Sequence, residues 1–155
     1  MIKTNEQMRK LLSEVAGRPP LHPELKALAA GGFTAKSGCQ FLSALLQNSK
    51  SVTRKDFPDA VGLECFVNSV HIDDYDVTDP LLQAIVFVEE VLRAWKATGS
   101  DYILVAIISS EENNVVVKFH LKRDGQRWLA EDLDRYLDAI LVAEISSKEP
   151  LNALF

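Results

Sequence analysis

The sequence predicts an α+β domain in which a mainly antiparallel sheet of about four strands packs against one long helix. Three observations lead to this class. The second half of the chain contains apolar runs with the alternation or the β-branched composition of strands. Residues 79–98 repeat apolar side chains at helical spacing. Residues 1–50 show helical spacing only, and therefore predict a helical N-terminal portion.

Length and composition predict a single domain that covers residues 1–155. A chain of 155 residues is long enough to bury one sizeable core, and its 47% apolar and 25% charged residues are ordinary for a globular protein. Within this domain we expect the helical portion over residues 1–50 and an α/β core over residues 63–145.

The N-terminal portion is expected to contain three helices. The first begins at a Thr4 cap and ends at Gly17. The second covers Pro23–Ala30 and is ended by a pair of glycines. The third covers about Ala35–Gln47, where large apolar residues fall on one side. The polar segment 48–62 then predicts a loop.

The predicted core begins with an alternating strand followed by the long helix. Leu63–Ile72 alternates in the manner of a strand, which places His71 and Asp73 on the same face. The helix over 79–98 follows, because Asp79 is a suitable N-cap and a proline fits the first turn.

Four further elements complete the predicted core. The almost wholly apolar run Tyr102–Ser109 predicts a central strand, and Val115–Leu121 alternates as its hairpin partner across a four-residue loop. A helix is expected from about Trp128 to Asp138, with Leu137 among its inward side chains. Residues 139–145 predict the last strand.

Charge is distributed unevenly along the chain, although the net charge is only −5. Residues 1–55 contain nine Lys and Arg against three Glu, whereas residues 56–155 contain eight against nineteen acidic residues. Residues 56–90 contain nine acidic residues and no Lys or Arg. Such an asymmetry indicates charged partners.

The acidic residues predict a surface that binds a basic protein. One group lies in the expected loop before the long helix, and a second shares the outer face of the expected helix over 128–138. Tyr75 and Trp128 are the aromatic anchors that such an interface would use. The predicted partner-binding residues are Asp73, Asp74, Tyr75, Asp76, Asp79, Trp128, Glu131, Asp134 and Asp138. We expect reversal of the charges on Asp73, Asp74 and Asp76 to slow association with the basic partner without unfolding this protein.

The alternative interpretation is that these acids only keep the surface solvated and that Trp128 belongs to the core.

A metal-dependent enzyme is the second hypothesis. His71 and Asp73 leave the same face of one predicted strand, and His120 lies on the polar face of another. Two imidazoles and a carboxylate can bind a divalent metal or exchange protons. The spacing matches no specific ligand motif, so neither metal nor cofactor is expected.

A nucleic-acid-binding regulator is the third hypothesis. The short basic helices of the N-terminal portion, with Lys36, Lys50, Arg54 and Lys55, resemble a crude helix-turn-helix. The positive charge is scattered, however, and aromatic residues do not alternate with it, so nucleic acid is not the expected partner.

Other classes lack their sequence signals. There is no Gly-x-Ser-x-Gly, no phosphate-binding loop and no Cys-x-x-Cys. Cys39 and Cys65 are flanked by apolar residues and predict reduced, packed thiols. No apolar run has the length of a membrane span, and the first ten residues lack a signal-peptide core, which predicts a cytoplasmic protein.

The run "VVVKFHLKRDGQRWLAEDLDRYLDAILV", together with "ECFVNSVHIDDY" upstream, resembles the small cytosolic immunity proteins of bacterial polymorphic-toxin and contact-dependent growth inhibition systems. The resemblance covers about Leu63–Ile145. It implies a single-domain α/β protein without enzymatic activity. The sequence leaves open whether the protein is a monomer or a homodimer. It further implies binding to one cognate toxin, often a basic nuclease, whose active site or essential surface is blocked. The resemblance supplies no contact residues, because these families share no contact motif.

Overall fold

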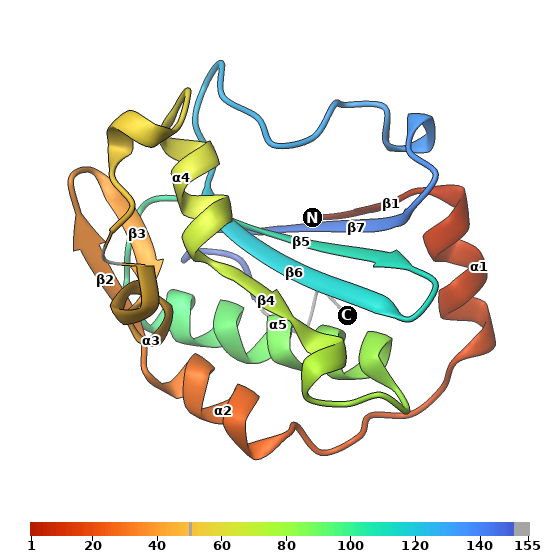
Figure 1. Ribbon diagram of the computed structural model, residues 1–155. Coiled ribbons are helices and arrows are strands. Elements are labelled where there is room, and N and C mark those ends of the chain that lie inside the picture. The colour runs from red at the N-terminus through yellow and green to blue at the C-terminus, as the bar shows by residue number, and fades with distance from the viewer. Residues whose placement is uncertain (50, 151–155) are drawn as a thin grey trace.

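The computed structural model describes residues 1–49 and 51–150, and it has the α+β fold that the sequence predicts (Figure 1). The elements in chain order, with η marking a 3-10 helix, are β1 (Ile2–Thr4), α1 (Glu6–Glu14), α2 (Pro23–Ala30), β2 (Phe33–Lys36), β3 (Cys39–Leu42), α3 (Ser43–Leu46), η1 (Gln47–Ser49), η2 (Arg54–Asp56), α4 (Ala60–Val67), β4 (Ser69–His71), η3 (Ile72–Asp74), α5 (Pro80–Ala97), β5 (Leu104–Glu111), β6 (Asn114–Leu121), η4 (Leu133–Arg135) and β7 (Ala139–Ile145).

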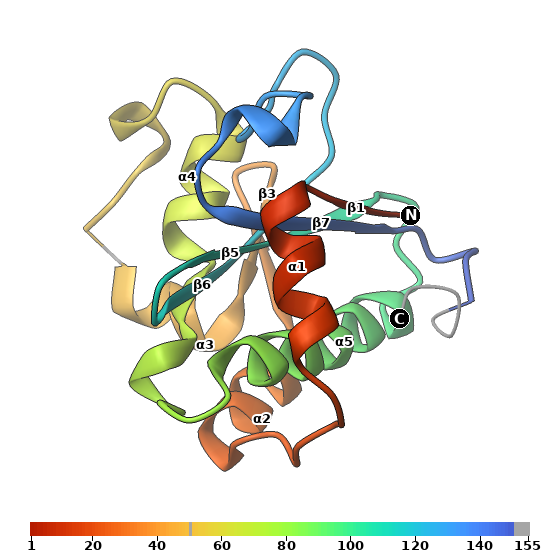
Figure 2. The same cartoon turned by 90° about the vertical axis from the view of Figure 1, so that its right-hand side faces the viewer.

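The main sheet has five strands in the order β1-β7-β5-β6-β4, and each neighbouring pair is antiparallel. Strands β2 and β3 form a separate two-stranded sheet. Helix α5 covers one face of the main sheet, and the long connection between β6 and β7 passes over the other face (Figures 1 and 2). We call the face that α5 covers the inner face and the opposite one the outer face.

The hydrophobic core lies between α5 and the inner face. Phe87 of α5 packs edge to face against Phe119 of β6, with 5.9 Å between the ring centroids. Trp95 packs in the same manner against Phe33, at 5.0 Å. Met8 of α1 is buried in the same cluster, so the N-terminal portion packs onto the α/β core. Each large apolar side chain buried in this way contributes about 1.5–3 kcal/mol.

The long helix and three of the strands confirm the sequence prediction. The helix expected over 79–98 is α5, and the last strand is β7. The hairpin expected after Tyr102 is formed by β5 and β6, but only two residues separate the strands. Glu112 in this turn has a φ of 53°, the left-handed conformation that tight hairpin turns use.

The helix predicted over Ala35–Gln47 is wrong, because residues 33–42 form a β-hairpin and only Ser43–Leu46 are helical. Ser37 and Gly38 connect the two strands and have φ values of 53° and 77°. Two successive residues with positive φ define the tight turn that matches the twist of a hairpin. The Ser37-Gly38 pair indicated this turn, but the spacing of the leucines that follow favoured a helix.

The strand predicted over Leu63–Ile72 is also wrong over its first half. Residues 60–67 form helix α4, and only Ser69–His71 form a strand. The Asp59 side chain accepts a hydrogen bond from the Gly62 amide at 2.8 Å and caps the helix. Helix α4 is buried on nearly all sides, so its sequence lacks the one-sided period by which a surface helix is identified.

The helix predicted from Trp128 to Asp138 is wrong as well, because this segment is irregular apart from the single turn η4. Two of its carbonyls, those of Leu133 and Asp138, accept hydrogen bonds from the Asn5 side chain. The five-stranded main sheet agrees with the expectation of a mainly antiparallel sheet of about four strands. The additional strand is β1, a three-residue edge strand that is too short to show a period.

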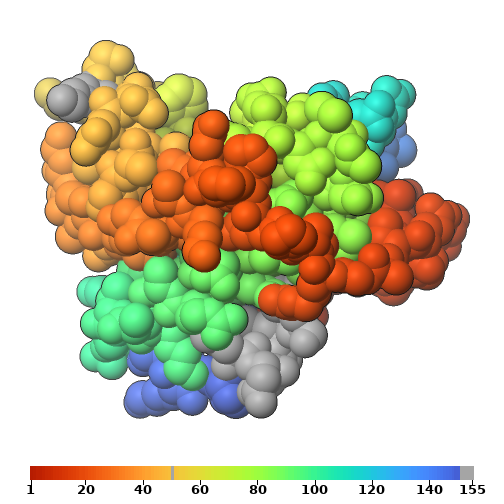
Figure 3. Space-filling view, turned by 90° about the horizontal axis from the view of Figure 1, so that it is seen from below, coloured from red at the N-terminus to blue at the C-terminus, as the bar shows by residue number. Residues whose placement is uncertain are grey.

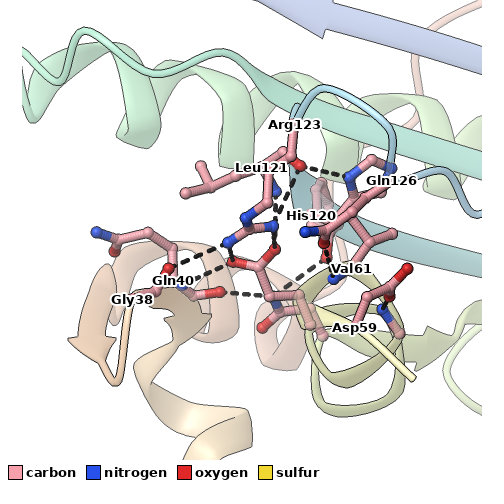
Figure 4. A network of polar contacts seen from close by, with 12 residues as sticks. Gly38, Gln40, Asp59, Val61, His120, Leu121, Arg123 and Gln126 are labelled. Atoms are coloured by element: carbon pink, nitrogen blue, oxygen red, sulfur yellow. Dashed lines mark hydrogen bonds and ion pairs between the residues drawn. The ribbon is translucent and has the colours of Figure 1, made fainter. Parts of the chain in front are cut away.

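Polar side chains of α4 join the two sheets (Figure 4). The Glu64 carboxylate accepts hydrogen bonds from the Gln40 amide of β3 at 2.8 Å and from the Leu121 amide of β6 at 3.1 Å. Arg123 forms an ion pair with the same carboxylate. Glu64 has no exposed surface, and its charge is therefore balanced inside the protein.

Candidate functional site

The two predicted acidic segments, 72–79 and 131–138, lie at the same end of the sheet (Figures 1 and 2). At this end β5 turns into β6, His71 of β4 lies opposite Val116, and Ala139 of β7 lies opposite Ser110. Segment 72–79 leaves β4 here, and segment 131–138 enters β7 here. They therefore flank the β5–β6 turn on its two sides.

We call residues 72–79, 111–114 and 131–138 together the acidic end. These three segments contain ten acidic residues and one basic residue, Arg135. Figure 3 shows segment 72–79 in light green next to the cyan β5–β6 turn. The exposed acidic residues are Asp74, Asp79, Glu111, Glu112, Glu131, Asp132 and Asp134. Glu111, Glu112 and Asp132 were not among the predicted site residues, although Glu111 and Glu112 occupied a predicted turn.

Segment 72–79 is held in place by two of its own carboxylates. Asp73 accepts a hydrogen bond from the Val115 amide at 3.0 Å, which ties η3 to the start of β6. Asp76 accepts from the amides of Thr78 and Asp79 at 2.8 and 3.0 Å. Asp73 and Asp76 therefore shape the loop, and its freely presented charges are those of Asp74 and Asp79.

Segment 131–138 is fixed by Asn5, which has no exposed surface. Its side-chain amide donates to the carbonyls of Leu133 and Asp138 at 3.2 and 2.7 Å. Its carbonyl oxygen accepts from the amides of Met8 and Ile140 at 3.1 and 2.9 Å. These bonds replace the helical bonds that the sequence pattern suggested.

The remaining side chains of segment 131–138 have different roles. The Asp134 carboxylate accepts a hydrogen bond from the Glu6 amide at 2.8 Å, at the start of α1. Glu131 lies 3.7 Å from Arg127, an exposed pair of little energetic value. Asp138 is half-buried.

The two predicted aromatic anchors occupy other environments. Tyr75 is half-buried against the core, and its ring meets that of His22 edge to face at 5.6 Å. Trp128 is 44% exposed and lies outside the acidic end, where its ring is 5.4 Å from the Lys118 ammonium. The interpretation of Trp128 as a core residue is therefore wrong.

The acidic end does present exposed apolar side chains, but at residues other than the two predicted aromatic anchors. Leu137 is 92% exposed and Val77 is 85% exposed, one in each of the acidic segments. Sequence reasoning missed both, and it placed Leu137 inside a helix. Its flanking residues Tyr136 and Asp138 gave no signal of exposure.

The residues of the metal hypothesis are not brought together. His71 of β4 lies opposite Val116 of β6. His120 lies four residues beyond Val116 on β6, so the two histidines are about 13 Å apart along the strands. Asp73 is bonded to the Val115 amide instead. Among residues 1–49 and 51–150, no group of three His, Cys, Asp or Glu side chains is placed to hold a metal ion.

The basic residues of the nucleic-acid hypothesis lie on different elements. Lys36 ends β2, whereas Arg54 and Lys55 belong to η2. Lys50 lies outside the described residues. Because the predicted third helix is a hairpin, the described residues provide no pair of helices in this region with helix-turn-helix spacing.

Both cysteines are buried and reduced, as predicted. Burial raises the pKa of the Cys65 thiol to about 12 and also raises the pKa of Cys39. A thiol with a raised pKa forms little thiolate at neutral pH, so neither cysteine has the character of a nucleophile.

The fold and the acidic end define a small α+β protein with a carboxylate-rich surface at one end of an antiparallel sheet. By sequence the chain belongs to the Uncharacterized protein PM0498 family, whose model matches residues 3–152. It is 31% identical over 125 residues to Uncharacterized protein PM0498 of Pasteurella multocida (strain Pm70), an alignment that covers 74% of this chain and 79% of the relative.

No solved structure has significant similarity to this chain. Within the described part of the chain, no helix has the length and apolar character needed to cross a membrane.

Proposed function

We propose that this protein is a cytoplasmic immunity-type protein, without enzymatic activity, that binds a basic toxin domain through the acidic end and thereby neutralises it. The observation that carries this proposal is the charge of the acidic end. Among its carboxylates, only Glu131 has an ion-pair partner within 4.0 Å in the described part of the chain. No described basic residue of the N-terminal portion forms an ion pair with these carboxylates.

Unneutralised charge of one sign attracts a partner of the opposite sign. Such a surface raises the rate of encounter by about 10–10³-fold at low salt and disfavours acidic competitors. A nuclease domain has a positively charged surface that binds phosphate groups, and an acidic cover would occupy it in place of nucleic acid.

The exposed apolar side chains supply apolar contact area, which charged side chains alone do not provide. Val77 follows Asp76 and Leu137 precedes Asp138 in the chain, so each apolar side chain lies next to a carboxylate residue, as at the polar rim of an interface. Asn5, Asp73 and Asp76 hold the two segments in place, so little conformational entropy is lost on binding.

The test takes as candidate partner any toxin domain that is found encoded beside this gene. Its growth-inhibitory activity should be suppressed when this protein is co-expressed, and the purified pair should associate rapidly at low salt. The informative variant is Asp74→Lys combined with Glu112→Lys, because neither side chain forms a hydrogen bond or ion pair with another described residue. We expect association to slow by about tenfold and to depend less on salt.

A matched control reverses two charges at the opposite end of the sheet. Asp101 precedes β5 and Asp124 follows β6, so Asp101→Lys with Asp124→Lys changes the net charge equally. This control should alter the association rate by less than about twofold. Equal effects of the two double variants, or failure to protect cells from the toxin, would contradict the proposal.

A further inference from the structure

A cavity of about 290 Å³ lies between the outer face of the main sheet and the connection formed by residues 123–133. Its floor includes the apolar side chains of Val105, Ile107 and Val142. Trp128 and Leu129 contribute to its cover. The volume is near the lower limit of small-molecule sites, which suits a ligand with one ring.

His120 supplies a hydrogen-bond acceptor to this cavity. It lies on the outer face of β6, is 6% exposed, and its Nδ1 is 2.7 Å from the Leu121 carbonyl oxygen. A carbonyl oxygen can only accept, so Nδ1 carries the proton. Burial lowers the pKa of His120, which keeps the ring neutral at pH 7 and leaves a lone pair on Nε2.

Nε2 of His120 is reachable from the cavity. It forms no hydrogen bond with the described residues, where the ring is bonded only through Nδ1. Among those same residues, no buried side-chain nitrogen or oxygen lacks a partner. Nε2 must therefore have accessible surface, and the cavity is the space that His120 borders.

Lys3 supplies a positive charge at the other side of the same cavity. It lies opposite Val142 on β1, three strands away from β6, which corresponds to about 14 Å across the sheet. The other cationic side chains of the lining are paired: Lys122 with Glu144 at 3.0 Å, Arg127 with Glu131 at 3.7 Å, and Arg123 with Glu64. Lys3 has no carboxylate within 4.0 Å in the described part of the chain.

We propose that this cavity binds a small single-ring organic acid that carries a hydroxyl group. The hydroxyl donates to Nε2 of His120, the ring rests on Val105 and Ile107 beside Trp128, and the carboxylate pairs with Lys3. This site lies on the outer face and does not depend on the proposed partner. It shares the lining residues Glu131 and Leu133 with the acidic end, but none of the proposed ligand contacts belongs to the acidic end.

The test uses three probes that share one ring size: 4-hydroxyphenylacetate, phenylacetate and 4-hydroxyphenethyl alcohol. Each is titrated into the full chain while amide and indole signals are followed by NMR. We expect 4-hydroxyphenylacetate to shift the signals of Val105, Val142 and Trp128 saturably. Phenylacetate should bind about fivefold more weakly, because it lacks the hydroxyl that Nε2 accepts. Long-range proton–nitrogen spectra should show His120 protonated at Nδ1.

Two variants separate the contributions of the protein. Lys3→Met should weaken the binding of both carboxylate probes by about threefold and leave the binding of the neutral alcohol unchanged. Its matched control is Lys36→Met on exposed β2, which should affect none of the probes. His120→Phe should abolish the advantage of the hydroxyl. If this variant does not fold, the comparison of probes with and without the hydroxyl in the unmodified protein decides the same point.

Three results would overturn the proposal. The first is the absence of saturable shifts at the cavity residues with all three probes. The second is equal affinity for phenylacetate and its hydroxyl derivative. The third is a His120 ring protonated at Nε2, which would leave no acceptor facing the cavity.

Discussion

At the scale of single residues, the interior is organised by buried polar side chains that satisfy backbone groups. Asn5 and Asn68 each form several hydrogen bonds to main-chain atoms, and Gln83 of α5 holds the chain between α1 and α2. Each of these side chains connects elements far apart in the sequence. An unpaired buried polar group costs about 1–3 kcal/mol, so each is a point at which one substitution has a large effect.

The first residue-scale prediction concerns His120 and pH. Because burial lowers its pKa, the unfolded chain binds a proton more readily than the folded chain. Above the unfolded pKa of about 6.5 both states are neutral and His120 costs no stability. Stability should then fall as the pH is lowered from about 6.5 to the folded pKa, below which no further loss occurs.

The measurement is urea unfolding of the natural chain and of His120→Phe at about pH 7.5 and about pH 5.5. The natural chain should lose more stability on acidification than the variant does. An equal loss in the two proteins would show that burial of this imidazole does not contribute to the acid sensitivity.

At the scale of elements, α4 takes the place of a strand. Strand β4 pairs with β6 only as far as Lys118. Beyond that point, polar groups of α4 and of its C-terminal cap form hydrogen bonds with the backbone of β6. The Asn68 side-chain amide donates to the Phe119 carbonyl at 3.2 Å, and the backbone carbonyl of Asn68 accepts from the Phe119 amide at the same distance. The same side chain bonds the Leu42 amide and the Gln40 carbonyl of β3, at 2.8 and 2.9 Å. A helix thereby closes two sheet edges that would otherwise be open to aggregation.

We predict that Asn68→Ala lowers the free energy of unfolding by about 3 kcal/mol, because it leaves main-chain groups on both sheets without partners. Hydrogen exchange of the Leu42 amide should accelerate more than that of amides in β5. The matched control is Asn48→Ala in exposed η1, which should change stability by less than about 0.5 kcal/mol. A stability loss of similar size in both variants would contradict the role assigned to α4.

At the scale of the whole molecule, the first residues of the chain support the part of the acidic end that lies in its last third. Strand β1 pairs with β7, and Asn5 then holds the irregular segment 131–138 from the opposite end of the sequence. The acidic end therefore depends on contacts that span nearly the full length of the chain. Strong negative charge can accumulate there because these hydrogen bonds oppose its mutual repulsion.

We predict that Asn5→Ala lowers stability by about 3 kcal/mol and accelerates hydrogen exchange in residues 131–138 more than in segment 72–79. The reason is that four hydrogen bonds are lost at a site without solvent. Gln7→Ala on the exposed side of α1 serves as control and should leave both quantities unchanged. Uniform acceleration across the molecule would indicate general destabilisation instead of a local support.

Sequence reasoning was accurate where the local pattern and the packing agree. Helix α5 and strand β6 were predicted from the apolar side that each one buries, and β5 and β7 from apolar runs that are largely buried on both faces. It was wrong for α4, which is buried on nearly all sides, and for residues 128–138, where the Leu133 and Asp138 carbonyls bond to Asn5. Of the predicted site, the acidic character is evident from the sequence, whereas the exposure of Leu137 and the shaping roles of Asp73 and Asp76 are not.

The sequence by itself determined the fold class, the long helix, the central hairpin and the concentration of carboxylates after residue 55. These properties follow from composition and from periods of two or 3.6 residues, which are local. Only the tertiary structure decided that two acidic segments meet at one end of the sheet, that His71 and His120 lie apart, and that a cavity forms over the outer face. These depend on strand order and on hydrogen bonds between distant residues, and no local period encodes either one.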